Sequence, residues 1–238
     1  MAQWGTFVGI ASVVLVLVLV LAHLTQRAVS TEGPDGLGPL STKASPRKRR
    51  LSPMGSLGLL LVGAALSAAI PASALGIEWS SSALTFGLGI GSVFGIGLFL
   101  VSEGSVWLAR QRSIEPDETL REPPSTHVDG SAGSLLAGVA LPIVAIVEEL
   151  LFRAVLIGAL AMVSGLSPAL LVLPSAVAFG IGHGLQGRLG IAVTALLGLG
   201  LGAGYVLTES LLVVIVAHYL VNLLEFVRHE GTIGTTRS

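Results

Sequence analysis

The sequence predicts an all-α protein, folded in the membrane as a polytopic bundle of about seven transmembrane helices. Of its 238 residues, 52% are hydrophobic and 11% are charged, whereas a soluble globular domain has about 25% charged residues. The apolar residues form long blocks separated by polar loops. The positive charges are concentrated in alternate loops, which is typical of a multi-pass membrane protein.

Each of the apolar blocks is long enough to cross a bilayer, which takes about 20 helical residues. The blocks cover residues 4–24, 54–77, 84–109, 134–161, 168–186, 189–208 and 210–228. No positively charged segment precedes the first block, and no small-residue cleavage site follows at the expected place. We therefore expect a membrane helix there rather than a cleaved signal peptide.

The longer polar stretches divide the chain into four parts. We expect residues 1–53 to form the first helix and a basic cytoplasmic loop, and residues 54–133 to form the second and third helices and a polar loop. Residues 134–228 would form the functional core, and residues 229–238 a cytoplasmic tail.

The distribution of Lys and Arg predicts the orientation of the bundle. If loop 25–53 is cytoplasmic, seven spans place loop 110–133, Arg188 and the C-terminal tail on the same side. Twelve of the 13 Lys and Arg residues then face the cytoplasm, and the thirteenth, Arg153, lies in the membrane. This pattern follows the positive-inside rule, so we expect the N-terminus outside and the C-terminus in the cytoplasm.

Glycines repeat at four-residue intervals in several of the predicted helices. These are Gly87, Gly91 and Gly95, and the pairs Gly180 and Gly184, Gly198 and Gly202, and Gly200 and Gly204. Small residues at this spacing let membrane helices approach closely, so we expect packing faces there rather than chemistry.

Few strongly polar side chains lie inside the predicted spans. They are Glu148, Glu149, Arg153, His183, His218 and Asn222. Ionised groups at the bilayer centre cost at least about 2.5–3.5 kcal/mol each on insertion scales, and they usually mark functional sites. Glu103 and Glu225 lie near predicted cytoplasmic helix ends, where solvent is accessible, and we assign them no role.

Helical spacing separates the two adjacent glutamates. Glu149 and Arg153 are four residues apart, so they share a helix face and are expected to pair. Glu148 points about 100° away and is expected to face a cavity. A purely structural reading is open for part of this set, because intramembrane charges often pair and Asn222 is suited to a helix–helix hydrogen bond.

The residue types suit two kinds of hydrolytic chemistry. A carboxylate and a histidine, here Glu148 and His183, can activate water, and His218 with Asn222 can donate hydrogen bonds to an oxyanion. Alternatively, Glu148, His183 and His218 could bind a divalent metal such as zinc. The residues alone leave both mechanisms open, with either no cofactor or a metal. The chain has no cysteine, which excludes thiolate catalysis and cysteine metal sites.

Three motifs resemble one family of membrane proteases. Glu148-Glu149-Leu-Leu-Phe-Arg153 resembles the EExxxR motif of the CAAX prenyl protease and bacteriocin-processing (CPBP) family of intramembrane endopeptidases. Phe179-Gly-Ile-Gly-His183 resembles its FxxxH motif, and His218-Tyr-Leu-Val-Asn222 its HxxxN motif. The motifs occur in the family's order within residues 134–228.

The resemblance implies roles for individual residues. Glu148 and His183 would activate the water, His218 and Asn222 would stabilise the oxyanion, and Glu149 with Arg153 would support the site. Members of the family have been described both as metalloproteases and as metal-independent glutamate proteases. Eukaryotic members remove the last three residues of prenylated CAAX proteins at the cytoplasmic face, and some prokaryotic members are linked to bacteriocin immunity.

The resemblance also implies the partners and the location of the protein. We expect a membrane-associated protein or peptide as substrate, the lipid bilayer as environment and no nucleic acid. The short outside loops and the absence of sorting signals favour a prokaryotic cell membrane.

Two other functions use similar residues. A proton- or ion-coupled transporter also needs Glu, His and Arg inside a bundle, although the chain lacks the internal repeat of many transporters. A non-catalytic immunity protein would bind a peptide without cutting it. Substrate flux in proteoliposomes would favour the first alternative, and full protection by a Glu148→Gln variant would favour the second.

Overall fold

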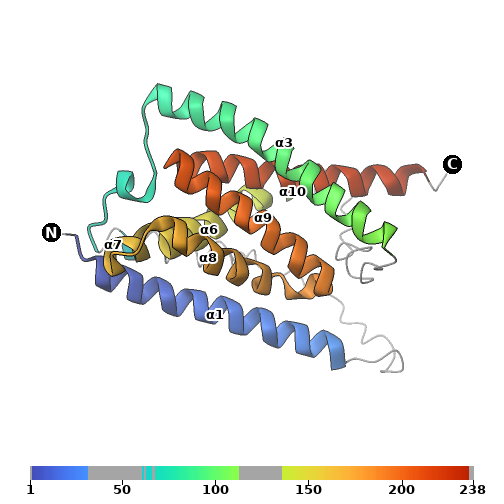
Figure 1. Cartoon of the computed structure of the whole chain (residues 1–238), viewed down its shortest axis with the longest axis horizontal. Helices are drawn as coiled ribbons and strands as arrows, with labels where there is room; N and C mark the ends of the chain where they lie inside the picture. The colour runs from blue at the N-terminus through green and yellow to red at the C-terminus, as the bar shows by residue number, and fades with distance from the viewer. Residues whose placement is uncertain (1, 32–60, 62, 66–67, 113–135, 236–238) are drawn as a thin grey trace, which may run out of the picture.

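The structure is a computed structural model that describes residues 2–31, 61, 63–65, 68–112 and 136–235. Every regular element in this part of the chain is helical. Figure 1 shows an elongated bundle whose long helices run roughly along one axis, with the two chain ends at opposite ends of the bundle. The predicted all-α class is thus confirmed for the described residues.

The described helices follow the predicted apolar blocks. They are α1 (Trp4–Thr31), η1 (Ala72–Leu75), α3 (Ser81–Gln111), η2 (Leu136–Ala140), α6 (Leu141–Glu149), η3 (Leu150–Ala159), α7 (Leu160–Ser164), α8 (Pro168–Gly182), η4 (Gly184–Gln186), α9 (Gly187–Thr208) and α10 (Leu211–Thr235). The start of α3 has a clear sequence cause, because the side chain of Ser80 accepts a hydrogen bond from the backbone N–H of Ala83 at 3.2 Å.

Three of these helices are long and apolar enough to cross a membrane. They are Ser81–Gln111, Gly187–Thr208 and Leu211–Arg228, and shorter apolar helices cover Trp4–Val20 and Pro168–Gly182. Side chains such as Leu88, Val93 and Leu100 of α3 are exposed on its outer surface, as expected where lipid rather than water is the neighbour. The chain is an integral membrane protein.

The predicted second span is only partly described, and its predicted end at residue 77 is wrong. Among the described residues, the chain turns at Ala68 and Ala69, and Ala69 has a positive φ of 52°. A 3₁₀ turn, η1, then follows Pro71. Proline cannot continue the helical hydrogen-bond ladder and restricts the residue before it, which explains the early end of the helix.

The predicted fourth span is continuous, but it is not a uniform α-helix. From Leu136 to Ser164 the backbone stays helical, with π-helical turns in η2 and η3 on either side of α6. The first π segment ends just before Pro142, whose ring would clash with a carbonyl in a tight turn. Wide π turns are frequent at functional sites, and η3 begins directly after the two glutamates.

The predicted fifth helix, residues 168–186, is four residues too long at its C-terminal end. The α-helical part of α8 ends at Gly182, and the tighter turn η4 covers Gly184–Gln186. Glycines surround His183, and Gly187 has a φ of 74°, which favours glycine. His183 therefore lies at the end of a helix rather than inside one.

The repeated glycines form helix contacts, as predicted. A Cβ atom on Gly91 or Gly95 would lie 2.7 Å from a backbone oxygen of α10, that of Val213 or Ala217. In α9, Gly198 and Gly202 face α8, whereas Gly200 and Gly204 face α3. These close approaches join α3, α8, α9 and α10 into one core.

We predict that Gly95→Leu destabilises the protein by about 1–3 kcal/mol, because the new side chain would overlap the backbone of Ala217. Thermal unfolding in detergent would measure this loss. Gly97→Leu is the matched control, since a Cβ there has no neighbour within 4 Å among the described residues. Equal stability of the two variants would contradict the proposed close contact between α3 and α10.

Candidate active site

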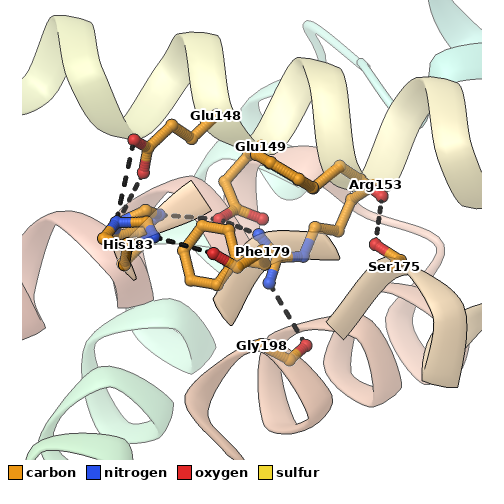
Figure 2. Close-up of polar contacts among 9 residues, drawn as sticks. Glu148, Glu149, Arg153, Ser175, Phe179, His183 and Gly198 are labelled. Atoms are coloured by element: carbon orange, nitrogen blue, oxygen red, sulfur yellow. Dashed lines mark hydrogen bonds and ion pairs between the residues drawn. The ribbon is translucent and has the colours of Figure 1, made fainter. Parts of the chain in front are cut away.

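Three helices bring the predicted site residues together. Glu148 lies near the end of α6, His183 directly follows α8, and His218 lies in the first half of α10. Glu148 Oε1 is 3.9 Å from His183 Nε2, and Glu148 Oε2 is 3.5 Å from His218 Nε2. Figure 2 shows the Glu148 carboxylate directed toward the imidazole of His183. One carboxylate thus faces two imidazole nitrogens.

Both imidazoles are held through their other nitrogen. His183 Nδ1 lies 2.8 Å from the backbone oxygen of Phe179, one turn earlier in α8. His218 Nδ1 lies 2.6 Å from Oε1 of Glu149. Since a carbonyl and a carboxylate accept hydrogen bonds, each Nδ1 acts as the donor and each Nε2 is directed at Glu148.

Glu149 and Arg153 form the predicted ion pair. Their side chains are fully buried, and Arg153 Nη1 donates to Glu149 Oε1 at 2.6 Å. Arg153 Nη2 donates to the backbone oxygen of Gly198 in α9 at 3.2 Å, and the guanidinium lies 4.6 Å from the centre of the Phe179 ring. Glu148 makes no ion pair with Arg153 in the described part of the chain, so Arg153 pairs with Glu149, whereas His218 contacts both glutamates.

Part of this network was not predicted from the sequence. Glu149 receives hydrogen bonds from both Arg153 and His218, and so connects the η3 segment to α10. The carbonyl of Gly198 had no sequence signal, because every residue has one. Phe179 had a signal, since it precedes His183 by one turn, but the cation–π contact with Arg153 depends on how the helices pack.

Ser175 supports the backbone beside the site. Its hydroxyl donates to the backbone oxygen of Phe152 in η3 at 2.7 Å, and its side chain is buried. A hydroxyl that donates to a carbonyl in this way is not poised as a nucleophile.

Asn222 lies one helical turn beyond His218 and is partly buried. Its side chain makes no hydrogen bond with the residues that the structure describes. Its expected role in binding an oxyanion stays a prediction.

Glu225, which the sequence analysis set aside as solvated, is partly buried and linked to α3. Ser102 Oγ donates to Glu225 Oε1 at 3.1 Å, and Arg228 forms an ion pair with Glu103. The spacing offered a signal, because Glu225 follows Asn222 by three residues and so lies on the same side of α10. These contacts fix the C-terminal halves of α3 and α10 to each other.

A cavity of about 220 Å³ lies beside Glu148 and His183. Its other lining residues are apolar or glycine: Val14, Val18, Leu61, Val147, Leu151, Phe152 and Gly182. The side chains of Glu148 and His183 are 13% and 26% exposed, respectively. Glu148 Oε2 is buried and accepts no hydrogen bond from the described residues, and the same holds for Glu149 Oε2.

The carboxylate and imidazole groups at this site are of types that bind a divalent metal, but they do not converge on one point as metal ligands do. A zinc ion takes three protein ligands and a water in catalytic sites. Here each oxygen of Glu148 is opposite a different histidine. Within the described residues, no group of three His, Asp or Glu side chains has the arrangement of a metal site. We therefore derive no reaction step through a metal.

Comparison with known proteins agrees with the motif resemblance. The family model of the type II CAAX prenyl endopeptidase Rce1-like proteins matches residues 131–224. This segment contains Glu148, His183, His218 and Asn222 and extends from before η2 into α10. No curated protein and no solved structure matched the chain. Residues 131–224 are therefore similar to the Rce1-like family of type II CAAX prenyl endopeptidases.

Proposed function

We propose that this protein is an intramembrane endopeptidase that hydrolyses a peptide bond in a membrane-associated protein or peptide, with water activated by Glu148. The observation that carries the proposal is the placement of one partly buried carboxylate, whose Oε2 accepts no hydrogen bond from the described residues, against two imidazole Nε2 atoms at 3.5 and 3.9 Å. These separations leave each pair beyond a direct hydrogen bond, within bridging distance of a water.

In this mechanism Glu148 accepts a proton from the water while the oxygen attacks the carbonyl carbon. His183, fixed through Nδ1 by the Phe179 carbonyl, accepts a hydrogen bond from the same water at Nε2 and orients it. The protonated Glu148 then gives its proton to the leaving nitrogen as the tetrahedral intermediate collapses. Each proton is thus accounted for without a covalent intermediate.

His218 and Asn222 would stabilise the negative charge on the carbonyl oxygen. The Glu149 carboxylate accepts from His218 Nδ1 at 2.6 Å and so orients the imidazole, whose Nε2 faces the site. Arg153 in turn fixes Glu149 and is itself held by Gly198 and Phe179. Glu149 and Arg153 are positioning residues in this scheme.

The orientation proposed from charge is supported by the arrangement of the helices. Figure 1 shows the end of α3, the start of α9 and the C-terminus at the same end of the bundle. Arg112, Arg188 and Arg228 lie in these segments. We propose that this end faces the cytoplasm, with seven spans and the N-terminus outside, most simply in a prokaryotic cell membrane.

Because the chain contains no cysteine, single cysteines can report this topology. We predict that a membrane-impermeant maleimide labels Glu78→Cys in intact cells, whereas Arg112→Cys is labelled only after the membrane is opened. The two positions lie just before and just after α3, and both residues are exposed. The reverse labelling pattern would contradict the proposed orientation.

The metal question has a direct test. We predict that hydrolysis continues at an unchanged rate in excess EDTA and 1,10-phenanthroline, and that purified active protein contains no stoichiometric metal. Loss of activity with chelator and its return with zinc would instead assign Glu148, His183 and His218 as ligands. In that case the ion would supply a polarised water and carbonyl.

The test of the function itself is peptide cleavage by purified protein, with Glu148→Gln as the decisive variant. A farnesylated peptide ending in a CAAX sequence is the first probe, because the matched family is named for that substrate class. Comparison of membrane peptides by mass spectrometry, with and without active protein, would identify the natural substrate.

A further inference from the structure

The cavity beside Glu148 and His183 is completed by residues outside the matched segment. Val14 and Val18 belong to α1, and Leu61 belongs to the second predicted apolar block, residues 54–77. The family match begins only at residue 131. One wall of the cavity therefore comes from Val147, Glu148, Leu151 and Phe152, and the facing wall comes from the N-terminal region.

The inward face of α1 is distinct from its outer face. Phe7, Ala11 and Val14 are at most 3% exposed and recur every three to four residues, as one side of a helix does. Val13 and Leu17, on the other side, are 61% and 58% exposed. Beyond Val14, Leu19 of α1 also approaches Gly182, directly before His183. The α1 helix is thus seated against the candidate active site.

We propose that Val14 and Val18 are specificity-determining residues, which limit the size of the apolar substrate side chain next to the cleaved bond. The inference rests on the proposed function. Its physical basis is that the cavity has an apolar lining with Glu148 and His183 at one side, so a group that fills it is held directly beside the attacking water. Because α1 borders this space with branched side chains, a change there alters the volume without touching the catalytic groups.

The first experiment measures kcat/KM for farnesylated peptides Cys-Xaa-Val-Ser, where Xaa is Ala, Val, Leu or Phe. Val14→Phe is expected to reduce cleavage of the Leu and Phe peptides by at least about tenfold, and that of the Ala peptide by less than about threefold. Val14→Ala should shift the preference toward Phe. Val13→Phe and Leu17→Phe are the matched controls on the exposed face and should keep the wild-type preference.

Equal changes for all four peptides, or no change, would overturn the proposal. Loss of all cleavage in Val14→Phe through misfolding would leave Val14→Ala and Val18→Ala to decide it, since both only remove atoms. A change of preference in the Val13→Phe control would also count against a role specific to the inward face.

A second experiment does not require turnover. In a Glu148→Gln background, single variants Val14→Cys and Val18→Cys are labelled with N-ethylmaleimide, and the Leu peptide should slow labelling at least fivefold. Labelling of Leu17→Cys should stay constant. Protection by farnesylated cysteine alone would show that the prenyl chain fills the space, and unchanged labelling would show that nothing does; either result overturns the proposal.

The two proposals can fail separately. Cleavage that survives Glu148→Gln contradicts the proposed function even if the peptide protects Val14→Cys. Cleavage that depends on Glu148 together with an unchanged peptide preference in the Val14 variants contradicts only the role of α1.

Discussion

Replacing Glu148 with glutamine is expected to lower peptide hydrolysis by at least about 100-fold, because the amide cannot accept the proton of the attacking water. Glutamine keeps the size of the side chain and removes only the negative charge. Since Glu148 makes no hydrogen bond through Oε2 in the described part of the chain, the folded state loses little in this variant. The measurement is kcat/KM on the farnesylated peptide, with thermal unfolding in detergent as the check on folding.

Glu78→Gln is the control for this experiment, because Glu78 is an exposed carboxylate far from the site in the sequence. It should retain wild-type activity. Hydrolysis at the wild-type rate by Glu148→Gln would exclude Glu148 as the base. His183→Ala should also lose activity, because the water would keep its base but lose the imidazole that orients it.

Replacing Arg153 with methionine is expected to destabilise the protein by about 3–5 kcal/mol, since it removes the guanidinium that pairs with the fully buried Glu149 carboxylate. The same change removes the donor to the Gly198 carbonyl and the contact with the Phe179 ring. The segments η3, α8 and α9 would lose a side chain that connects all three. Denaturant or thermal unfolding in detergent would measure the loss.

Two further variants separate the buried charge from the packing of the side chain. Glu149→Gln/Arg153→Met removes both charges and should recover part of the lost stability, whereas Arg153→Lys should recover little because lysine lacks the planar fork of donors. Arg228→Met is the surface control: its ion pair with Glu103 is partly exposed, so the cost should be at most about 1 kcal/mol. Equal effects of Arg153→Met and Arg228→Met would show that the buried pair is not a structural anchor.

The arrangement explains why two adjacent glutamates lie in an apolar helix. Glu149 is neutralised by Arg153 and also orients His218, so it connects the helix to α10. Glu148 points to another side, where its neighbours are two imidazoles and an apolar cavity. In the proposed function, Glu149 orients the site, and the preceding residue, Glu148, carries the chemistry.

Much of this was predictable from the sequence because it depends on local spacing. The four-residue interval between Glu149 and Arg153 places both on one helix face, and the structure confirms their pair. The cost of polar groups in lipid singled out Glu148, His183 and His218, which the structure brings together. Glycine spacing predicted the contacts of α3 and α9, which are present as well.

Other features were decided only by the tertiary structure. The tautomer of His218 follows from Glu149, 69 residues earlier in the chain, and the anchor of Arg153 includes a backbone carbonyl at Gly198. In a membrane protein apolar residues face both lipid and the interior, so the sequence of α1 did not indicate which valines border the cavity. The sequence by itself therefore determined the class of the fold, the candidate site residues and the Glu149–Arg153 pair. Packing between helices decided how those residues meet, because contacts distant in sequence leave no periodic signal.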